Sequence, residues 1–187
     1  MKAKTLIFPG IIISILFLYL FTSLISTPQV VWASNTEPSP DPSPVAENSE
    51  SGLSPKFPIS IQQWKEIIEL NAKYFNLDAN LIASVILQES GGNPLAYSSS
   101  GAVGLMQVMP RDGLAAGFIC NENPCFRSRP SMQELYDPQF NIEYGSKMLI
   151  GLINEYGDWR EALHTYGPMD VGYEYANLVL LIQNNYQ

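Results

Sequence analysis

The chain has 187 residues, enough for one domain with appendages, and 46% of them are hydrophobic, which is enough to build a core. Its formal net charge is −8, and it contains only ten Lys and Arg residues. A protein that binds nucleic acid needs a basic face for the phosphates, so the composition excludes nucleic acid as an expected partner.

The first 33 residues are typical of an export segment. Lys2 and Lys4 precede a stretch from Leu6 to Ser26 that has no charged residue. The small residues around Val31-Trp32-Ala33 suit a signal peptidase, but an uncharged stretch of this length also suits a membrane anchor at residues 6–26. Both interpretations predict an exported protein, extracellular or in the cell envelope. Only an uncleaved segment would attach it to a membrane.

Residues 34–58 are rich in Ser, Pro, Asn and Glu and contain the near-repeat PSPDPSP. Such a segment cannot bury enough apolar surface to fold, which predicts a disordered linker. The folded domain is therefore expected at residues 59–187, where seven Lys and Arg residues face fourteen Asp and Glu residues, a formal charge of −7. We expect this domain to be a monomer.

Helical periodicity and capping residues predict the first half of this domain. Ser60 is expected to cap a helix through residues 61–75, in which apolar residues recur at helical spacing. Asp78 is expected to cap a second helix, which ends at Glu89 or Ser90 before two glycines. Residues 91–113 are rich in Gly, Ser and Pro, which predicts an irregular loop.

Three further helices are expected in the second half. Asp137 and Pro138 predict the cap and first position of a helix through residue 157. Asp158 is expected to cap a shorter helix within WREALHTYG, and a last helix is expected over residues 171–185. The domain is therefore predicted to be mostly α, with one glycine-rich loop after its second helix.

Two cysteines, Cys120 and Cys125, enclose the turn-rich sequence NENP. In a chain that is expected to leave the cytoplasm, this spacing predicts a disulfide. The alternative is a metal site, but His164 is the only histidine and there is no third cysteine, so a zinc ligand set is incomplete. We expect neither a metal nor another cofactor.

Glu89 lies in the last turn of the second predicted helix, on the same face as Ile82, Val85 and Ile86. Burial on that face and the negative end of the helix dipole both favour the protonated carboxyl, so its pKa is expected to rise. A carboxyl that stays protonated near neutral pH can act as the general acid in glycoside cleavage. The alternative is a side chain that turns to solvent as the helix ends.

The segment 89–110, ESGGNPLAYSSSGAVGLMQVMP, resembles the signature of lytic transglycosylases of the soluble (SLT), goose-lysozyme-like type. It contains a Glu-Ser pair, Asn-Pro, a Ser nine residues after the Glu, Gly-Ala-x-Gly-Leu-Met-Gln and Met-Pro in the family's register. The resemblance continues through RPSMQELYDPQFNIEYGSKML and covers most of residues 76–180. It implies a lysozyme-like fold and peptidoglycan glycan strands as the partner.

The resemblance also implies roles for the matching residues. Glu89 is the implied catalytic acid and base. The implied substrate-binding residues are Ser98, Gln107, Met109 and Tyr166. One motif departs from the family, which usually has Ala-Tyr-Asn-Ala-Gly-Pro where this chain has Thr165-Tyr166-Gly167-Pro168. The departure concerns the contacts expected of this shortened motif and not the role of Glu89.

The implied reaction cleaves the β-1,4 bond between N-acetylmuramic acid and N-acetylglucosamine and forms a 1,6-anhydromuramoyl product with one Glu. A hydrolysing muramidase on the same fold is an alternative that needs a second carboxylate, for which Asp112, Glu143 and Asp170 are candidates. Their other interpretations are a turn former, a solvent-facing helix residue and an N-cap. An inactive glycan-binding module is a third hypothesis, although a pure binder has no need for a buried acid.

Overall fold

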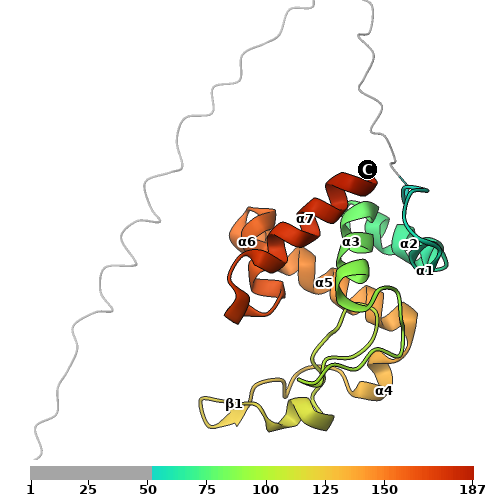
Figure 1. The fold of residues 1–187 in the computed structure, drawn as a ribbon. Coiled ribbons are helices and arrows are strands. Elements are labelled where there is room, and N and C mark those ends of the chain that lie inside the picture. Colours follow the sequence, from blue (N-terminus) through green and yellow to red (C-terminus); the bar gives the residue numbers. More distant parts are fainter. Residues whose placement is uncertain (1–51) are drawn as a thin grey trace, which may run out of the picture. The chain divides into compact units, whose positions relative to one another are not determined.

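The computed structural model describes residues 52–187, and this part of the chain is mostly helical (Figure 1). The predicted export segment and the predicted linker up to residue 51 lie outside the described residues. In chain order the elements are α1 (Ile59–Gln62), α2 (Lys65–Phe75), α3 (Ala79–Ser90), η1 (Gly113–Gly117), β1 (Ile119–Cys120), β2 (Asn123–Pro124), α4 (Met132–Leu135), α5 (Pro138–Tyr156), α6 (Trp159–Tyr166), η2 (Met169–Val171) and α7 (Glu174–Tyr186). None of the helices within residues 52–187 is both long and apolar enough to cross a membrane.

The last residues of the predicted linker pack onto the helical core. Leu53 and Phe57 are buried, and the Phe57 ring stacks on Tyr186 of α7 with ring centroids 4.5 Å apart. The backbone N–H of Leu53 donates a 2.8 Å hydrogen bond to Oε1 of Glu69. The folded unit thus includes residues 53–58, because two apolar side chains among the prolines find places in the core.

The first predicted helix is divided in two, and the predicted cap at Ser60 is wrong. Ser60 lies inside α1, whose N-cap is Pro58, and α2 begins only after Trp64. Trp64 has φ −99° and ψ 5°, outside the helical range, and its indole N–H donates a 3.0 Å hydrogen bond to the carbonyl of Gly92. This contact across 28 residues accompanies the break in the helix.

The predicted aspartate caps are confirmed. Asp78, Asp137 and Asp158 each accept hydrogen bonds from backbone N–H groups in the first turn of their helix, which satisfies donors without an intrahelical partner. Gly91 ends α3 with φ 61°, a left-handed conformation that glycine adopts at little cost. The last helix begins at Glu174, three residues later than predicted, because the chain first makes the 3₁₀ turn η2.

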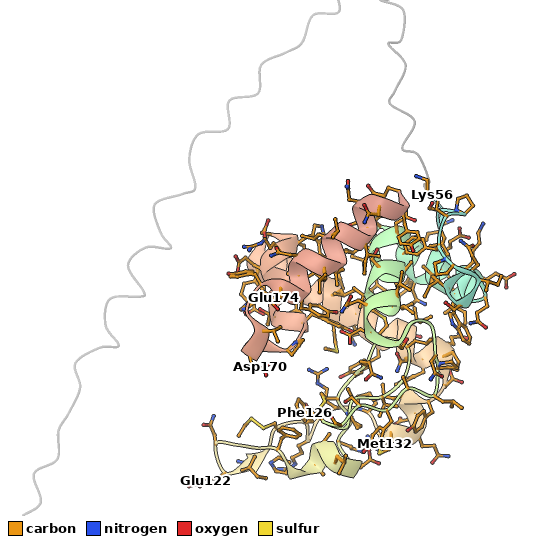
Figure 2. All side chains as sticks on the ribbon, viewed as in Figure 1. Lys56, Glu122, Phe126, Met132, Asp170 and Glu174 are labelled. Atoms are coloured by element: carbon orange, nitrogen blue, oxygen red, sulfur yellow. A yellow bond between two sulfur atoms is a disulfide. The ribbon has the colours of Figure 1, made fainter. Side chains whose placement is uncertain are left out.

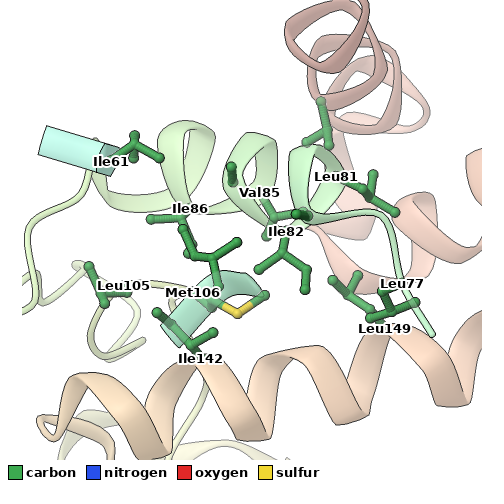
Figure 3. Close-up of a cluster of buried hydrophobic side chains, with 14 of the residues drawn as sticks. Ile61, Leu77, Leu81, Ile82, Val85, Ile86, Leu105, Met106, Ile142 and Leu149 are labelled. Carbon is green, nitrogen blue, oxygen red and sulfur yellow. The ribbon is translucent and has the colours of Figure 1, made fainter. Parts of the chain in front are cut away.

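The core is built around α3, whose residues 79–86 are all buried. This helix packs against α2 and α7, and α5 packs against α2 and α6. Figure 3 shows Ile82 and Ile86 of α3 facing Met106 and Ile142. Because Ile142 belongs to α5, the loop residue Met106 packs between α3 and α5. Each such fully buried side chain contributes roughly 1.5–3 kcal/mol to folding. The core therefore fixes the end of α3, and with it Glu89, against the loop that follows.

A short hairpin extends the segment between the loop and α4. The strands β1 and β2 pair antiparallel, and the two residues between them, Asn121 and Glu122, have φ 48° and 66°, as a type I′ turn requires. The predicted disulfide is present and joins Cys120 to Cys125. Turn and disulfide together close this segment on itself.

Candidate active site

The side chain of Glu89 is half-buried in the last turn of α3, one to two turns after the buried residues Ile82, Val85 and Ile86. Desolvation raises its pKa from 4.5 to about 7, and a hydrogen bond from Tyr175 opposes this rise. The predicted upward shift is confirmed, and the side chain does not simply turn to solvent. A group with this pKa is populated in both protonation states near neutral pH, so it can donate a proton and then accept one.

Tyr175, in the first turn of α7, holds the carboxyl in place. Its hydroxyl donates a 2.6 Å hydrogen bond to Oε1 of Glu89, and its ring is buried. Burial and the nearby Glu89 raise the pKa of Tyr175 well above 10, so it stays a donor at any physiological pH.

The ring of Tyr175 lies directly against Gly167, where a Cβ atom would collide with it. Gly167 stands in the motif that departs from the family, at the position after Tyr166. In this chain the departure therefore makes room for the tyrosine that contacts Glu89.

Tyr166, at the end of α6, lies close to the same carboxyl. Burial raises the pKa of Tyr166 well above 10, and the negative charge of Glu89 adds to the rise. Its hydroxyl donates a 2.9 Å hydrogen bond to the carbonyl of Met106. The structure thus brings Glu89, Tyr166 and Tyr175 together, although 86 residues separate the first from the last.

The loop after α3, residues 91–112, is held from three helices. Tyr166 holds the carbonyl of Met106, and Ser90 Oγ donates a 2.8 Å hydrogen bond to the carbonyl of Leu105. Asn141 of α5 is fully buried and uses both ends of its amide, donating to the carbonyls of Val103 and Leu135 and accepting from the N–H of Met106. These contacts fix the loop beside Glu89.

Gly104 has φ 78° and lies so close to the Asn141 amide that a Cβ atom would collide with it. Here the glycine is required both by the backbone conformation and by the close approach.

The remaining predicted substrate-binding residues all belong to this loop. Ser98 Oγ accepts a 2.9 Å hydrogen bond from the N–H of Ala102, which closes a turn. Gln107 has φ 47°, uncommon for a residue with a side chain, and its Nε2 donates to the carbonyls of Ala96 and Gly104. In this structure both side chains therefore bind the loop's own backbone.

Met109 is half-buried two residues further along the same loop. Its place in the loop is compatible with the role that the motif implies.

None of the three candidates for a second carboxylate contacts Glu89 through a hydrogen bond within residues 52–187. Asp112 accepts a 2.8 Å hydrogen bond from the N–H of Met132, and Glu143 is exposed on α5. Asp170 is exposed within η2 and does not cap α7, so its interpretation as an N-cap is wrong. The pKa shift of Glu89 has only burial and Tyr175 as its causes.

Sequence reasoning missed Tyr175 and Asn141. Tyr175 stands among apolar residues at helical spacing, where an aromatic side chain is normally part of the core. Asn141 is more conspicuous, because its position on the predicted helix has a polar residue directly before the buried Ile142. A buried amide needs partners, and this requirement is the one signal that points to a loop contact.

Comparison with known proteins agrees with the motif at residues 89–110. A family model described as the transglycosylase SLT domain matches residues 66–171, more than half of the chain. A solved structure of an inactive mutant of the lytic transglycosylase Slt from Pseudomonas aeruginosa is 23% identical, with a TM-score of 0.52, and covers 70% of this chain and 24% of that one. This likeness shows a shared fold.

Two relatives extend the comparison. Membrane-bound lytic murein transglycosylase E of Buchnera aphidicola subsp. Acyrthosiphon pisum is 40% identical over 90 residues, covering 48% of this chain and 39% of the relative. Endo-type membrane-bound lytic murein transglycosylase A of Klebsiella pneumoniae is 39% identical over 101 residues, covering 54% and 48%. The chain thus spans less than half the length of these relatives. With the fold, the family model and the motif in agreement, the chain belongs to the transglycosylase SLT domain family.

Proposed function

We propose that this protein is a peptidoglycan lytic transglycosylase with a lysozyme-like fold, in which Glu89 is the single catalytic acid and base. The observation that carries the proposal is the half-buried Glu89 carboxyl, with a pKa of about 7 and a hydrogen bond from Tyr175. Ordinary glycosidases use two carboxylates, and substrate-assisted enzymes are exceptions. A lone titrating carboxyl fits the exception.

The proposed reaction begins with the Glu89 carboxyl protonated. It donates this proton to the oxygen of the β-1,4 bond between N-acetylmuramic acid and N-acetylglucosamine, and the bond from C1 of the muramoyl residue to that oxygen breaks. The resulting carboxylate accepts the proton of the muramoyl C6 hydroxyl, whose oxygen bonds to C1 and closes the 1,6-anhydro ring. Glu89 is protonated again at the end, and no water is consumed.

The loop at residues 91–112 and Tyr166 supply the proposed sugar-binding surface. Ser98, Gln107, Met109 and Tyr166 match the family positions for this role, and the three-sided support of the loop is consistent with a preformed binding surface. Because Ser98 and Gln107 bind loop backbone in this structure, their contribution would be to hold the loop in shape as well as to contact sugar.

We further propose that the protein acts outside the cytoplasm, as a monomer and without a cofactor. The charge pattern of residues 1–33 supports export, and the disulfide between Cys120 and Cys125 suits an oxidising compartment. Both relatives described above are membrane-bound lytic murein transglycosylases by name, which is consistent with a place in the cell envelope.

Mass spectrometry of the fragments released from purified peptidoglycan tests the proposed function, with Glu89→Gln beside the unaltered protein. We expect products one water lighter than those of a muramidase, and none from the variant. Reducing-end products would identify a hydrolysing muramidase instead. Glycan binding without products from either protein would identify a binding module.

A further inference from the structure

Arg129 is a half-buried cation that pairs with no carboxylate in the described part of the chain. Its guanidinium instead donates to the sulfur of Met148 and lies 5.9 Å from the centre of the Tyr144 ring. These two contacts cover the side chain but leave its charge unneutralised. Arginine side chains are mostly exposed unless an acid pairs with them, so a half-buried guanidinium without a carboxylate partner is a candidate site for an anionic ligand.

The backbone around Arg129 is held in place. Its N–H donates a 2.9 Å hydrogen bond to the carbonyl of Phe126, and its carbonyl accepts one from Arg111 Nη1. The N–H of Arg111 donates to the carbonyl of Pro130. In Figure 2, Phe126 and Met132, which flank Arg129 in the sequence, lie on the lobe that carries the disulfide-closed hairpin. The cation therefore sits on an anchored segment rather than on a loose loop.

Arg129 also lies near the candidate active site. Its neighbours Tyr144 and Met148 are one turn apart on α5, and Gly145 between them packs against the side chain of Met106. The carbonyl of Met106 accepts the hydrogen bond from Tyr166. In agreement with this placement, the positive charge of Arg129 lowers the pKa of Tyr166, against the larger effects of burial and of Glu89.

The charge of the domain explains why a cation at this place would help substrate binding. The domain at residues 59–187 has a formal charge of −7, and the proposed substrate also carries negative charges, the carboxylates of its peptide stems. The two therefore repel each other at long range. A local cation beside the reacting sugar would offset this repulsion. Guanidinium groups bind carboxylates through two parallel hydrogen bonds, which fixes orientation as well as charge.

We propose that Arg129 binds a carboxylate of the substrate's peptide stem and so makes the enzyme selective for glycan strands that carry peptides. This inference rests on the proposed function. It predicts that the free guanidinium N–H groups of Arg129 face the bound stem while Met148 and Tyr144 support its side chain.

The test compares two substrates and three variants. One substrate is peptidoglycan strands with intact stems. The other is the same strands after an amidase has removed the stems, which leaves only the lactyl carboxylates. The variants are Arg129→Gln, Arg129→Lys and the control Arg127→Gln, since Arg127 is an exposed residue of the same segment. Thermal melting of each variant checks that the fold is retained.

We expect Arg129→Gln to lower kcat/KM by about 10- to 100-fold on strands with stems, mainly through KM, and less than about twofold on stripped strands. Arg129→Lys keeps the positive charge but loses the paired N–H donors of the guanidinium. Its kcat/KM on strands with stems is expected to lie between those of the unaltered protein and of Arg129→Gln. Arg127→Gln is expected to change kcat/KM by less than about twofold on either substrate. Equal losses on both substrates would overturn the proposal, as would a loss confined to stripped strands, which would assign Arg129 to the lactyl carboxylate.

A binding measurement separates this proposal from the proposed function. In a Glu89→Gln background, which needs no turnover, we expect Arg129→Gln to weaken binding of soluble stem-bearing strands by about tenfold and that of stripped strands hardly at all. Failure of the unaltered protein to form anhydro products would refute the proposed function. The binding measurement would still decide whether Arg129 recognises the peptide stem. Unchanged binding would refute the role of Arg129.

Discussion

The hydroxyl of Tyr175 donates a 2.6 Å hydrogen bond to Oε1 of Glu89, across 86 residues of sequence. This bond stabilises the carboxylate, whereas burial of the same group stabilises the protonated acid. A residue that must serve as acid and then as base needs both forms to be accessible. The opposition between burial and Tyr175 keeps the pKa of Glu89 near 7 and not higher.

Tyr175→Phe removes the donor and keeps the ring. The pKa of Glu89 is expected to rise further, so the decline in activity at high pH moves to higher pH. We expect kcat to fall by about 10- to 100-fold, since a hydrogen bond to a charged group is worth about 1.5–3 kcal/mol. The matched control is Tyr173→Phe, whose hydroxyl donates to Glu161 instead. A pH profile of kcat that is the same in all three proteins would refute the role of Tyr175.

Glu89→Gln is expected to stabilise the fold above neutral pH. Because the folded-state pKa of about 7 exceeds 4.5, the folded protein keeps a proton that the unfolded chain releases. The contribution of Glu89 to the stability of the unaltered protein is therefore fully present below pH 4.5 and is lost as the pH rises to 7, by about 3 kcal/mol in total. Thermal melting from pH 4 to 8 measures this as a growing advantage of the variant. The exposed Glu143→Gln serves as control, and a similar trend there would contradict the explanation.

Gly167→Ala is expected to displace the ring of Tyr175. Gly167 has φ −79°, which any residue adopts, so the effect comes from the collision of the new Cβ with the ring. We expect a loss of stability of about 1–3 kcal/mol and an activity defect like that of Tyr175→Phe. Gly151→Ala on α5 has open space around the new Cβ and is expected to be neutral or slightly stabilising. Full activity of Gly167→Ala would show that the ring can shift without cost.

Asn141→Ala removes three buried hydrogen bonds, from the N–H of Met106 and to the carbonyls of Val103 and Leu135. Of these groups, the Val103 carbonyl keeps a second bond from the N–H of Val108. The loss of these buried hydrogen bonds is expected to cost about 3 kcal/mol or more in denaturant unfolding, and to lower activity because the loop beside Glu89 loosens. Asn177→Ala is the control, because Asn177 is exposed and its side chain accepts a hydrogen bond from the side chain of Arg160. Equal effects of the two substitutions would contradict this role of Asn141.

Reduction of the disulfide is expected to have a limited effect. A loop as short as that between Cys120 and Cys125 constrains the unfolded chain little, and the expected loss is about 2 kcal/mol. The double variant Cys120→Ser, Cys125→Ser is therefore expected to fold, and its stability can be compared with that of the reduced unaltered protein. Global unfolding of the double variant would show that the disulfide contributes more to stability than the length of the loop it closes predicts.

Local signals in the sequence predicted the local parts of the structure. The caps at Asp78, Asp137 and Asp158, the end of α3 at Gly91 and the raised pKa of Glu89 all follow from residues within a few positions of one another. The motif at residues 89–110 was sufficient to predict the family.

Long-range contacts account for what the sequence did not predict. The break between α1 and α2 accompanies the bond from Trp64 to Gly92, and the donor to Glu89 comes from Tyr175 on the last helix. Gly167 is understood only when the ring that it accommodates is known. No local pattern encodes these pairs, because each depends on how distant helices pack.

The proposed role of Glu89 as acid and then base requires its carboxyl to titrate near neutral pH, which carbon NMR of protein labelled at the Glu carboxyl carbons can measure. The signal that is absent in Glu89→Gln identifies the residue. A midpoint at about pH 7 is the expected result, since burial raises the pKa to that value. A midpoint near 4.5 would show that water reaches the carboxyl freely, and would contradict its role as the proton donor.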